Sequence, residues 1–448
     1  MKRKDKSNSE FSAGSEFSAR SGNKYSIQRL IGEGGQGCVY EASCEGEKYA
    51  LKWYKTGTQG RPEQKEIIEN LIRRAKPSEA FLWPIDLIEH GDEFGYVMLL
   101  RPPGYLSIPA LLSRKAEPSF MTICKIGYNL VANYRKLHAS GYSYCDINFG
   151  NVFFDAETGD VLICDNDNVT IDGMKQSLAM GTIGFMAPEL VMACENHTSE
   201  RPSTVTDLHS LAVLLFYLFM IADPFQGELV NKIRCYDLAA KVQIYGKNPV
   251  FIFDPVDKSN RPVKGIDDNA IIFWNLYPDY FKDLFVRTFT DGLHSPKKRV
   301  QEIEWQNAII KMMDEMITCQ NCGAEVFYNP LIEKSHAAHT CWFCGNSLCV
   351  PAKLEIGDMT ILLNSESKIS EHHIKRNYNM EKTVARITRH PTYSNVWGLK
   401  NESTQNWIYE NSSGEQQIVK PGKSATVSHN AKILFGEATG VFRTKGEQ

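Results

Sequence analysis

The sequence lacks a long apolar run. Its longest apolar stretch, residues 211–222, is twelve residues long and is flanked by Asp207, His209 and Asp223. Because a membrane-spanning helix needs about 20 apolar residues, we expect a buried core helix here and no membrane partner. The N-terminus is rich in lysine and then polar, without the apolar segment of a secretory signal. We therefore expect a cytoplasmic protein.

The sequence also lacks an excess of charge of either sign. Its formal net charge is −3 over 448 residues, which gives no whole-chain indication of a nucleic-acid partner. This length favours two to four domains. Cysteine, in contrast, is plentiful: seven of the twelve cysteines are scattered along the first part of the chain, and five cluster between Cys319 and Cys349. Without a secretory signal, these thiols are expected to be reduced, and either free or bound to metal.

Three polar residues in one short region carry the first indication of function. Asp146 and Asn151 lie five residues apart in a loop that follows a helical run, and Asp165 follows a strand-like apolar run. Phosphoryl transfer needs a carboxylate that orients the attacking hydroxyl, and an Asp and an Asn that hold magnesium. A loop turn alone also explains such an Asp–Asn pair, so the neighbouring motifs decide. The region resembles the catalytic and metal loops of protein kinases, which implies Asp146 as the catalytic carboxylate and Asn151 and Asp165 as magnesium ligands.

A glycine-rich stretch precedes this region. Gly32, Gly34, Gly37 and Val39 form the pattern G-x-G-x-x-G-x-V. A dinucleotide-binding fold would continue from such glycines into a helix, whereas this chain continues into strand-like residues that reach Lys52. The arrangement resembles the phosphate-binding loop of protein kinases and the strand lysine that binds the α- and β-phosphates. The resemblance implies an ATP site formed by Gly32, Gly34, Gly37, Val39, Ala50, Lys52, Glu69, Met98, Leu100 and Phe153.

Protein kinases pair this strand lysine with a helix glutamate. Residues 62–75 are expected to form a helix, with a proline in its first turn and an apolar face. Three glutamates, Glu63, Glu66 and Glu69, lie about one turn apart on it. We expect Glu69 to be the partner of Lys52 because of its distance from Lys52 along the chain. Each of the three is also compatible with a solvated helix surface.

Later motifs resemble the C-terminal lobe of the same family. Residues 181–189 resemble the end of a kinase activation segment. Asp207 stands near the start of a stretch that resembles the large buried helix of the kinase C-terminal lobe. The resemblance implies that Asp207 hydrogen-bonds the backbone of the catalytic loop. Arg299 fits the arginine that pairs with Glu189, which is a structural pair rather than a catalytic one. Six motifs thus occur in the family's order over residues 25–316.

Three residues depart from the family pattern. Asn148 replaces a lysine two residues after Asp146, and the loss of one such electrostatic donor removes about 2–4 kcal/mol of transition-state stabilisation. Asp167 replaces the glycine of the metal motif, and it either binds magnesium itself or hinders the loop rotation that glycine permits. Cys145 replaces an arginine, which indicates weaker dependence on a phosphate in the activation segment, although that segment contains Thr170, Ser177 and Thr182.

Two C-x-x-C pairs predict a metal site. Cys319 and Cys322 are separated from Cys341 and Cys344 by eighteen residues, and each pair is followed directly by glycine. This spacing is typical of structural zinc, and a redox C-x-x-C is the alternative. Four thiolates would complete a tetrahedral site. Other donors nearby are not expected to be ligands: His336, His339 and Cys349.

The C-terminal part alternates short apolar runs with turns, which favours an all-β sandwich. Residues 369–374, 397–401 and 419–422 resemble segments of the forkhead-associated (FHA) domain. The two arginines that this family uses for phosphate fall on Asp358 and Glu371. Since both acids would repel phosphate, we expect no phosphothreonine binding. A sandwich without a ligand is the alternative.

The expected fold is α+β: a bilobal protein-kinase-like fold, a small zinc ribbon and an all-β FHA-like sandwich. The N-terminal tail contains Phe11 and Phe17 in a near repeat, which leaves a docking repeat open. The expected boundaries are residues 1–23 for a flexible tail, 24–316 for the kinase domain, 317–352 for the zinc ribbon and 353–448 for the FHA-like domain.

The expected function is that of a protein Ser/Thr kinase that uses ATP and Mg²⁺ or Mn²⁺, carries structural Zn²⁺, and phosphorylates itself and protein substrates. A pseudokinase scaffold that binds nucleotide and assembles partners is the alternative. The whole arrangement resembles bacterial kinases of tellurium-resistance-type stress systems. That resemblance implies two partners, a von Willebrand factor A-domain protein and a metal-dependent Ser/Thr phosphatase.

Overall fold

The structure is a computed structural model, and it divides the chain into two compact units. Unit 1 comprises Met1–Pro118, Lys125–Asn275 and Tyr280–Gln306, and unit 2 comprises Ser119–Cys124, Leu276–Asp279 and Asn307–Gln448. The zinc ribbon and the sandwich, expected as separate domains, thus fall in one unit. The residues that the structure describes are 11–35, 37–54, 61–172, 181–198, 200–335, 338–365, 367–390, 392–393 and 396–444.

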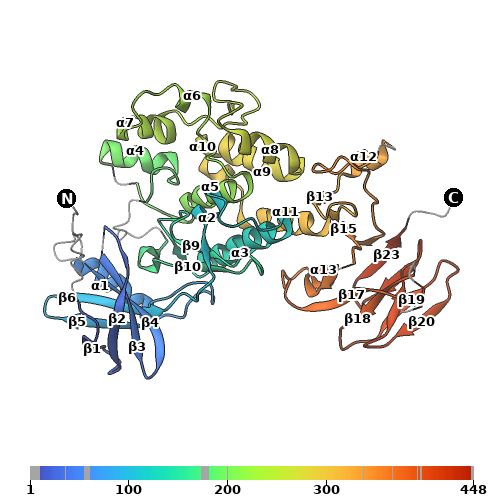
Figure 1. The fold of residues 1–448 in the computed structure, drawn as a ribbon, viewed down its shortest axis with the longest axis horizontal. Coiled ribbons are helices and arrows are strands. Elements are labelled where there is room, and N and C mark those ends of the chain that lie inside the picture. Colours follow the sequence, from blue (N-terminus) through green and yellow to red (C-terminus); the bar gives the residue numbers. More distant parts are fainter. Residues whose placement is uncertain are drawn as a thin grey trace, which may run out of the picture. The chain divides into compact units, whose positions relative to one another are not determined.

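Unit 1 begins with an antiparallel sheet of order β1-β2-β3-β4-β6-β5, accompanied by helix α1 (Figure 1). The turn between β3 and β4 has positive φ angles at Glu45 and Gly46, 51° and 87°, as a tight hairpin requires. The elements are β1 (Glu16–Ser18), β2 (Lys24–Glu33), β3 (Gly37–Cys44), β4 (Glu47–Tyr54), α1 (Arg61–Ile72), β5 (Asp86–His90) and β6 (Glu93–Leu99).

The N-terminal segment differs from the expected flexible tail. Residues 11–23 are folded, and β1 pairs with β2 in the register Phe17 opposite Tyr25. The rings of Phe11 and Phe17 lie 5.0 Å and 5.6 Å from the ring of Trp53. Trp53 is fully buried in the sheet, so the two phenylalanines cover the core and do not form an exposed docking repeat. Residues 1–10 lie outside the described part.

The rest of unit 1 is mostly helical, with two small sheets of order β10-β9-β7 and β11-β8. Helix α5 is buried over nearly its whole length, and Ser203 and Thr206 form a capping box at its start. The elements are β7 (Leu106–Ser107), α2 (Ile108–Leu112), α3 (Phe120–Ala139), β8 (Tyr142–Ser143), β9 (Val152–Phe154), β10 (Val161–Ile163), η1 (Asn166–Asn168), β11 (Thr170–Ile171), α4 (Pro188–Asn196), α5 (Thr204–Met220), α6 (Glu228–Asn231), α7 (Leu238–Val242), η2 (Gln243–Lys247), α8 (Asp268–Leu276), α9 (Asp279–Phe289), α10 (Asp291–His294), η3 (Pro296–Lys298) and α11 (Glu302–Asp314).

Unit 2 contains two larger antiparallel sheets, of order β15-β14-β23-β22-β19-β20 and β16-β17-β18-β21, and a hairpin of β12 and β13. Buried residues from both larger sheets form one core, as in a sandwich. The elements are β12 (Met316–Thr318), β13 (Glu325–Phe327), α12 (Pro330–Lys334), β14 (Lys353–Ile356), β15 (Met359–Leu362), β16 (Lys368–Ser370), α13 (Glu371–Lys375), β17 (Thr383–Arg389), β18 (Trp397–Asn401), β19 (Trp407–Glu410), β20 (Gln416–Val419), β21 (Ser424–Thr426), β22 (Lys432–Leu434) and β23 (Thr439–Arg443).

The segments of unit 2 are joined by a second core and by polar contacts. Cys319 and Cys341 belong to one hydrophobic cluster with Leu362 of β15. His373 of α13 lies 3.0 Å from Asp314 at the end of α11. One residue beyond the expected boundary near residue 352, Leu362, thus packs with the cluster that contains the cysteines.

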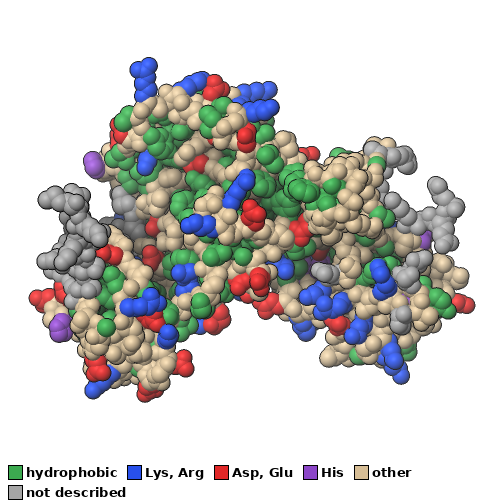
Figure 2. All heavy atoms as spheres, viewed as in Figure 1, with side chains coloured by type: hydrophobic (Ala, Val, Ile, Leu, Met, Phe, Trp, Pro, Cys, Tyr) green, Lys and Arg blue, Asp and Glu red, His purple; other side chains and the backbone are tan. Residues whose placement is uncertain are grey.

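Two whole-chain properties bear on the expected partners. Among the described residues, none of the helices combines the length and the apolar character that crossing a bilayer requires. On the face shown in Figure 2, basic and acidic side chains are interspersed, in keeping with the formal net charge of −3.

Candidate functional site

The loop that carries Asp146 is held in place by a residue of helix α5. The Asp207 carboxylate accepts hydrogen bonds from the backbone N–H groups of Tyr144, at 2.6 Å, and Cys145, at 3.3 Å. Cys145 has a φ of 67°, in the left-handed region that non-glycine residues seldom adopt. Since Asp207 is buried, these charge-assisted bonds fix the strained backbone next to Asp146. The expected role of Asp207 is confirmed.

Within this loop, Asp146 and Asn151 come together. The side-chain amide of Asn151 donates to the backbone carbonyl of Asp146 at 3.1 Å and lies 3.4 Å from its Oδ2. The other carboxylate oxygen, Oδ1, accepts a hydrogen bond from the Thr182 hydroxyl at 2.9 Å. Asn148 donates to Thr182 at 3.3 Å and accepts from the backbone N–H of Gly150 at 2.7 Å. Asn148 thus orients the loop and the threonine, without supplying a charge.

The hairpin of β9 and β10 brings Asp165 to the same place. The backbone N–H of Cys164 donates to the carbonyl of Asn151 at 3.0 Å, which aligns the residue before β9 with the residue after β10. Asp165 has a φ of 52°, and its side chain is 37% exposed. Its Oδ1 lies 3.4 Å from the Lys52 ammonium. Asp165 is therefore paired with Lys52 and still open to solvent.

Lys52 is buried, and its side chain is only 6% exposed. Its ammonium lies 2.8 Å and 3.0 Å from the two carboxylate oxygens of Asp167. Burial lowers the pKa of Lys52, but the negative charges of Asp167 and Asp165 outweigh burial, and the net pKa is raised. Lys52 is thus held as a cation by residues 165–167, which we call the metal loop after the kinase motif that they resemble.

The structure does not pair Lys52 with Glu69. The Glu69 carboxylate forms ion pairs with Arg20, at 3.0 Å, and Arg73, at 3.5 Å. In α1, Ile68 and Leu71 are buried, and Gln64 lies on the same face, one and two turns before them. Gln64, and not a glutamate, is the residue of α1 that reaches the metal loop. The expected ion pair between Glu69 and Lys52 is therefore not formed in this structure.

Asp167 does not fit the expected role of a magnesium ligand either. Its side chain is 1% exposed, and its carboxylate accepts hydrogen bonds from Lys52, from Tyr54 at 2.6 Å and from Tyr96 at 3.1 Å. Burial would raise the pKa of Asp167, but the charge of Lys52 and these hydrogen bonds lower it. For Asp165, burial is the largest cause, and its pKa is raised. Sequence reasoning missed Tyr54, Tyr96 and Gln64, although Tyr54 lies two residues from Lys52 on the same strand face.

The residues expected to line the adenine site are largely brought together. Val39, Ala50, Met98 and Leu100 lie in or against one apolar cluster that includes residues of β4, β5, β6 and α1. Phe153 pairs across β9 and β10 with Leu162, which packs against this cluster, and the guanidinium carbon of Arg101 lies 3.9 Å from the centre of the Phe153 ring. Gly32 pairs with Val39 across β2 and β3, and Gly34 donates a backbone hydrogen bond to Gly37 at 2.9 Å. A Cβ atom at Gly37 would lie 2.0 Å from the backbone oxygen of Trp53, so only glycine fits there.

Two further expectations concern the scaffold. Arg299 is buried and forms a bidentate pair with Glu189, with both N–O distances at 2.8 Å. The expected pair is confirmed. Ser177 of the activation segment lies outside the described residues. Thr182 of the same segment donates its hydroxyl hydrogen bond to Asp146.

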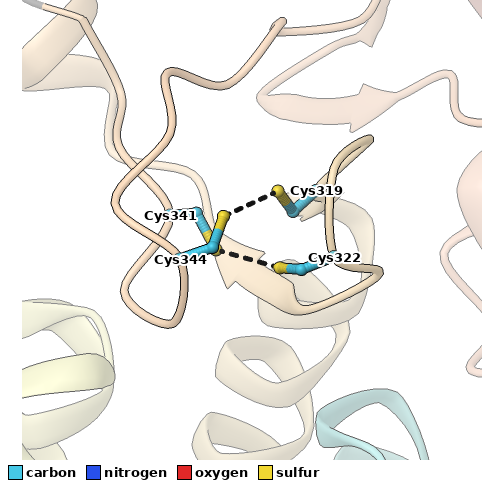
Figure 3. A group of neighbouring side chains, drawn as sticks. All are labelled: Cys319, Cys322, Cys341 and Cys344. Atoms are coloured by element: carbon cyan, nitrogen blue, oxygen red, sulfur yellow. Dashed lines mark hydrogen bonds between the residues drawn. The ribbon is translucent and has the colours of Figure 1, made fainter.

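The four predicted zinc cysteines form a compact group (Figure 3). Their sulfur atoms all lie within 4.8 Å of one another; those of Cys319 and Cys344 are 3.7 Å apart, and those of Cys322 and Cys341 are 3.6 Å apart. In a tetrahedral site with Zn–S bonds of about 2.3 Å, sulfur atoms lie about 3.8 Å apart, so this group fits a zinc ion. A hydrogen bond from the Asn346 backbone is the first cause that lowers the pKa of Cys344, to about 6, which favours a thiolate.

The other donors near these cysteines differ in position. Cys349 is exposed, and His339 is buried and stacks on Tyr328. His336 lies outside the described residues. In the described part of the chain, these four cysteines are the one group of three or more acidic, histidine or cysteine side chains that lie close enough to hold one metal ion together.

The two acids at the expected phosphate-binding positions are both paired with cations. Glu371 accepts hydrogen bonds from Lys375 at 2.9 Å and Lys382 at 3.0 Å, and two asparagine amides, Asn377 and Asn379, also donate to it. Asp358 pairs with Arg376. Lys375, Lys382 and Arg376 are thus already engaged by carboxylates of their own unit.

Comparison with known proteins places this geometry in a family. Residues 25–292 match the protein kinase domain. A probable serine/threonine-protein kinase of Clostridium perfringens (strain 13 / Type A) is 24% identical over 219 residues, which cover 46% of this chain and 30% of that relative. The matched region thus spans less than a third of the relative's length. The match to the family covers more than half of this chain and contains Lys52, Asp146, Asn151 and Asp165. The chain therefore belongs to the protein kinase family.

Proposed function

We propose that this chain transfers the γ-phosphate of ATP to serine or threonine hydroxyls of itself and of protein substrates. The observation that supports this most strongly is the convergence of Lys52, Asp146, Asn151 and Asp165. Lys52 and Asp165 lie 113 positions apart in the sequence and 3.4 Å apart in space. Asn151 and Asp146 are joined within the loop between them. These are the groups that phosphoryl transfer uses to orient the hydroxyl, to hold the metal ions and to bind the phosphates.

Each residue has a distinct role in this proposal. Asp146 is half-buried, and its carboxylate orients the incoming hydroxyl and receives its proton. Asn151 and Asp165 hold magnesium or manganese, which neutralises charge on the phosphate oxygens when bound. Lys52, held as a cation, contacts the α- and β-phosphates. Asn148 gives hydrogen bonds but no charge, so the transferring phosphate is stabilised less, by about 2–4 kcal/mol, than with a lysine there.

Transfer of labelled phosphate from ATP tests this proposal. The full chain is incubated with labelled ATP and magnesium or manganese, and compared with Asp146→Asn and Asp165→Asn variants. Both variants should lose the label, because the first lacks the hydroxyl-orienting carboxylate and the second lacks a metal ligand. Asp160→Asn is the matched control, since Asp160 is exposed on the β9–β10 hairpin. Equal labelling of the wild type and the Asp165→Asn variant would refute the proposal that this chain is a kinase.

A pseudokinase scaffold is the second candidate. Two observations favour it: Asn148 stands where a lysine is expected, and both carboxylates that contact Lys52 belong to the metal loop. A scaffold would bind ATP, measured as a rise in thermal unfolding temperature, without label transfer under any metal. The retained metal ligands make the enzyme the better supported of the two.

For unit 2, we propose a structural zinc ion on the four cysteines and an FHA-like sandwich that contacts protein without reading phosphate. The sulfur positions support the zinc ion, and the paired acids Glu371 and Asp358 support the loss of phosphate binding. We further propose a place in a bacterial stress-signalling system of the tellurium-resistance type, with a von Willebrand factor A-domain protein and a metal-dependent phosphatase as partners. The resemblance of the whole arrangement to such kinases supports this, and co-purification from the native cell tests it.

A further inference from the structure

The buried carboxylate of Asp167 is fully used by protein donors. The Lys52 ammonium donates to both of its oxygens, Tyr54 donates to Oδ2 and Tyr96 donates to Oδ1. A carboxylate offers about four lone-pair positions, so these four bonds occupy all of them. Asp167 therefore has no position left for a metal ion, and its contacts all serve Lys52 and the strands beside it.

The strands place these donors by their register. Lys52 and Tyr54 are two residues apart on β4 and so point to the same face. Tyr96 of β6 is the direct partner of Lys52 across the sheet. Three donors thus converge on one point from two neighbouring strands.

The metal loop brings Asp167 to that point. Asp165 adopts a left-handed conformation, and the three-residue helix η1 follows it directly. The buried side chain of Asn166 donates to the Ile163 carbonyl at 3.0 Å, which anchors this turn to the end of β10. The same turn therefore presents the Asp165 carboxylate toward solvent and the Asp167 carboxylate toward Lys52.

Helix α1 takes part without a charge. The side-chain amide of Gln64 donates to the backbone carbonyl of Asp167 at 2.7 Å. Glu69, which the family pattern suggested for this role, pairs with Arg20 and Arg73. A buried lysine without a carboxylate partner would cost several kcal/mol. The helix therefore supports Asp167, and Asp167 compensates Lys52.

We propose that Asp167 is the positioning residue for Lys52, and that this chain has moved the carboxylate partner of its phosphate-binding lysine from the helix to the metal loop. The proposal rests on the kinase reaction proposed above. Its consequence is that Lys52 and the metal ligand Asp165 are set by one turn, η1. A shift of α1 that leaves η1 in place does not unpair Lys52.

Two measurements on the full chain test this role. The first is the KM for ATP and kcat of the wild type, Asp167→Asn and Glu69→Gln. Asp167→Asn should lower kcat/KM for ATP at least tenfold, mainly through KM, because the lysine loses its orientation toward the phosphates. Glu69→Gln should stay within twofold of the wild type. A large loss in Glu69→Gln, or none in Asp167→Asn, would overturn the proposal.

The second measurement does not require catalysis. An adenosine sulfonyl fluoride sulfonylates the neutral amine of a lysine in the nucleotide site, forming a sulfonamide and releasing fluoride, and mass spectrometry locates the modified residue. At one fixed pH, Lys52 should be labelled at least tenfold faster in Asp167→Asn than in the wild type, since the carboxylate that binds its ammonium from both oxygens is gone. If the wild type transfers no phosphate, the kinase proposal fails while these labelling rates still decide the role of Asp167. Equal rates in the two proteins would refute it.

A rescue variant separates positioning from folding. Asp167→Gly should lose activity as Asp167→Asn does, and Gln64→Glu added to it should restore at least a third of the wild-type kcat/KM by returning a carboxylate from α1. Thermal unfolding of each variant verifies that it is folded. If Asp167→Asn does not fold, the comparison of Asp167→Gly with the Asp167→Gly, Gln64→Glu double variant takes its place. Failure of Gln64→Glu to raise activity in the folded double variant would count against the proposal.

Discussion

At the scale of single residues, His138 links the catalytic loop to the end of unit 1. Its Nε2 lies 3.2 Å from Asp207, which holds the backbone of the catalytic loop, and its Nδ1 contacts Glu302 at the start of α11. Burial lowers the pKa of His138, but the hydrogen bonds and charges of Asp207 and Glu302 outweigh it and raise the pKa to about 9. His138 is therefore a buried cation at neutral pH.

This raised pKa predicts a pH dependence of stability. The unfolded pKa of histidine is about 6.5, so the protonated pair stabilises the fold fully below pH about 6.5, and this contribution is lost as pH rises to about 9. The difference corresponds to about 3 kcal/mol at most. Denaturant unfolding at pH 6 and pH 9.5 should show this loss in the wild type and not in His138→Gln. An identical pH dependence in both proteins would contradict the prediction.

The proximity of Asp146, Asn151 and Asp165 was predictable, because they stand within one short stretch of sequence. The contacts of His138 and Asp167 were not. Each depends on partners that approach from distant segments: Glu302 lies 164 residues from His138, and Lys52 lies 115 residues from Asp167. A substitution in a motif, such as Asp167, shows that the local chemistry differs from the family pattern. It does not show which residues the new side chain contacts.

At the scale of elements, α1 shows where sequence reasoning succeeded and where it failed. The helix was expected over residues 62–75 and is present at Arg61–Ile72. Its two most deeply buried residues, Ile68 and Leu71, lie on the face that includes Gln64. Glu69 was chosen by its distance from Lys52 along the chain, and the apolar period would have pointed to Gln64. The expected partner was a glutamate, so a glutamine was not considered.

The cysteine group is the element on which metal removal should act. Cys319→Ser should lower the content from one zinc per chain, since apparent binding energies of such sites are about 10–16 kcal/mol and depend on all ligands. Amide hydrogen exchange should increase over residues 317–350 and in β15, because Leu362 shares the core with Cys319. ATP binding by unit 1 should persist.

Cys349→Ser is the matched control for this prediction, because Cys349 is exposed and is not one of the four grouped cysteines. Zinc content should stay at one per chain in this variant. Elemental analysis decides: a wild type without metal, or one with a Cys319–Cys341 disulfide, would rule out the zinc site.

At the scale of the whole molecule, the order of the parts was predictable and their independence was not. The kinase motifs, the cysteine pairs and the β-rich end follow one another as expected. Whether two modules share a core depends on contacts such as Cys319 with Leu362, which no local pattern reveals. The tail was misread for a related reason: Phe11 and Phe17 stand in a polar, serine-rich segment, and only the sheet shows what they cover.

The full chain should bind phosphothreonine peptides no more tightly than their unphosphorylated forms. Glu371 and Asp358 would repel the phosphate, and Lys375, Lys382 and Arg376 are already paired with these acids. Titration without ATP, using a degenerate phosphothreonine library and its unmodified counterpart, measures the difference. A tenfold gain with phosphate, about 1.4 kcal/mol, would contradict this expectation. Glu371→Ala frees two lysines and should increase the affinity for the phosphorylated library only.

Phe11 and Phe17, which cover the first sheet, and Arg299, which pairs with Glu189, limit where this protein can be truncated. A fragment trimmed to the family match, residues 25–292, would lack Phe11 and Phe17 at one end and Arg299 and Glu302 at the other. Trp53 would then lose the two rings that cover it, the carboxylate of Glu189 would lose Arg299, and the ring of His138 would keep Asp207 but lose Glu302. Such a fragment would keep every catalytic group and yet be prone to aggregate, so an inactive preparation of it would say nothing about the chemistry of the intact chain. Fragments meant for assay or crystallisation should begin before residue 11 and extend beyond residue 306.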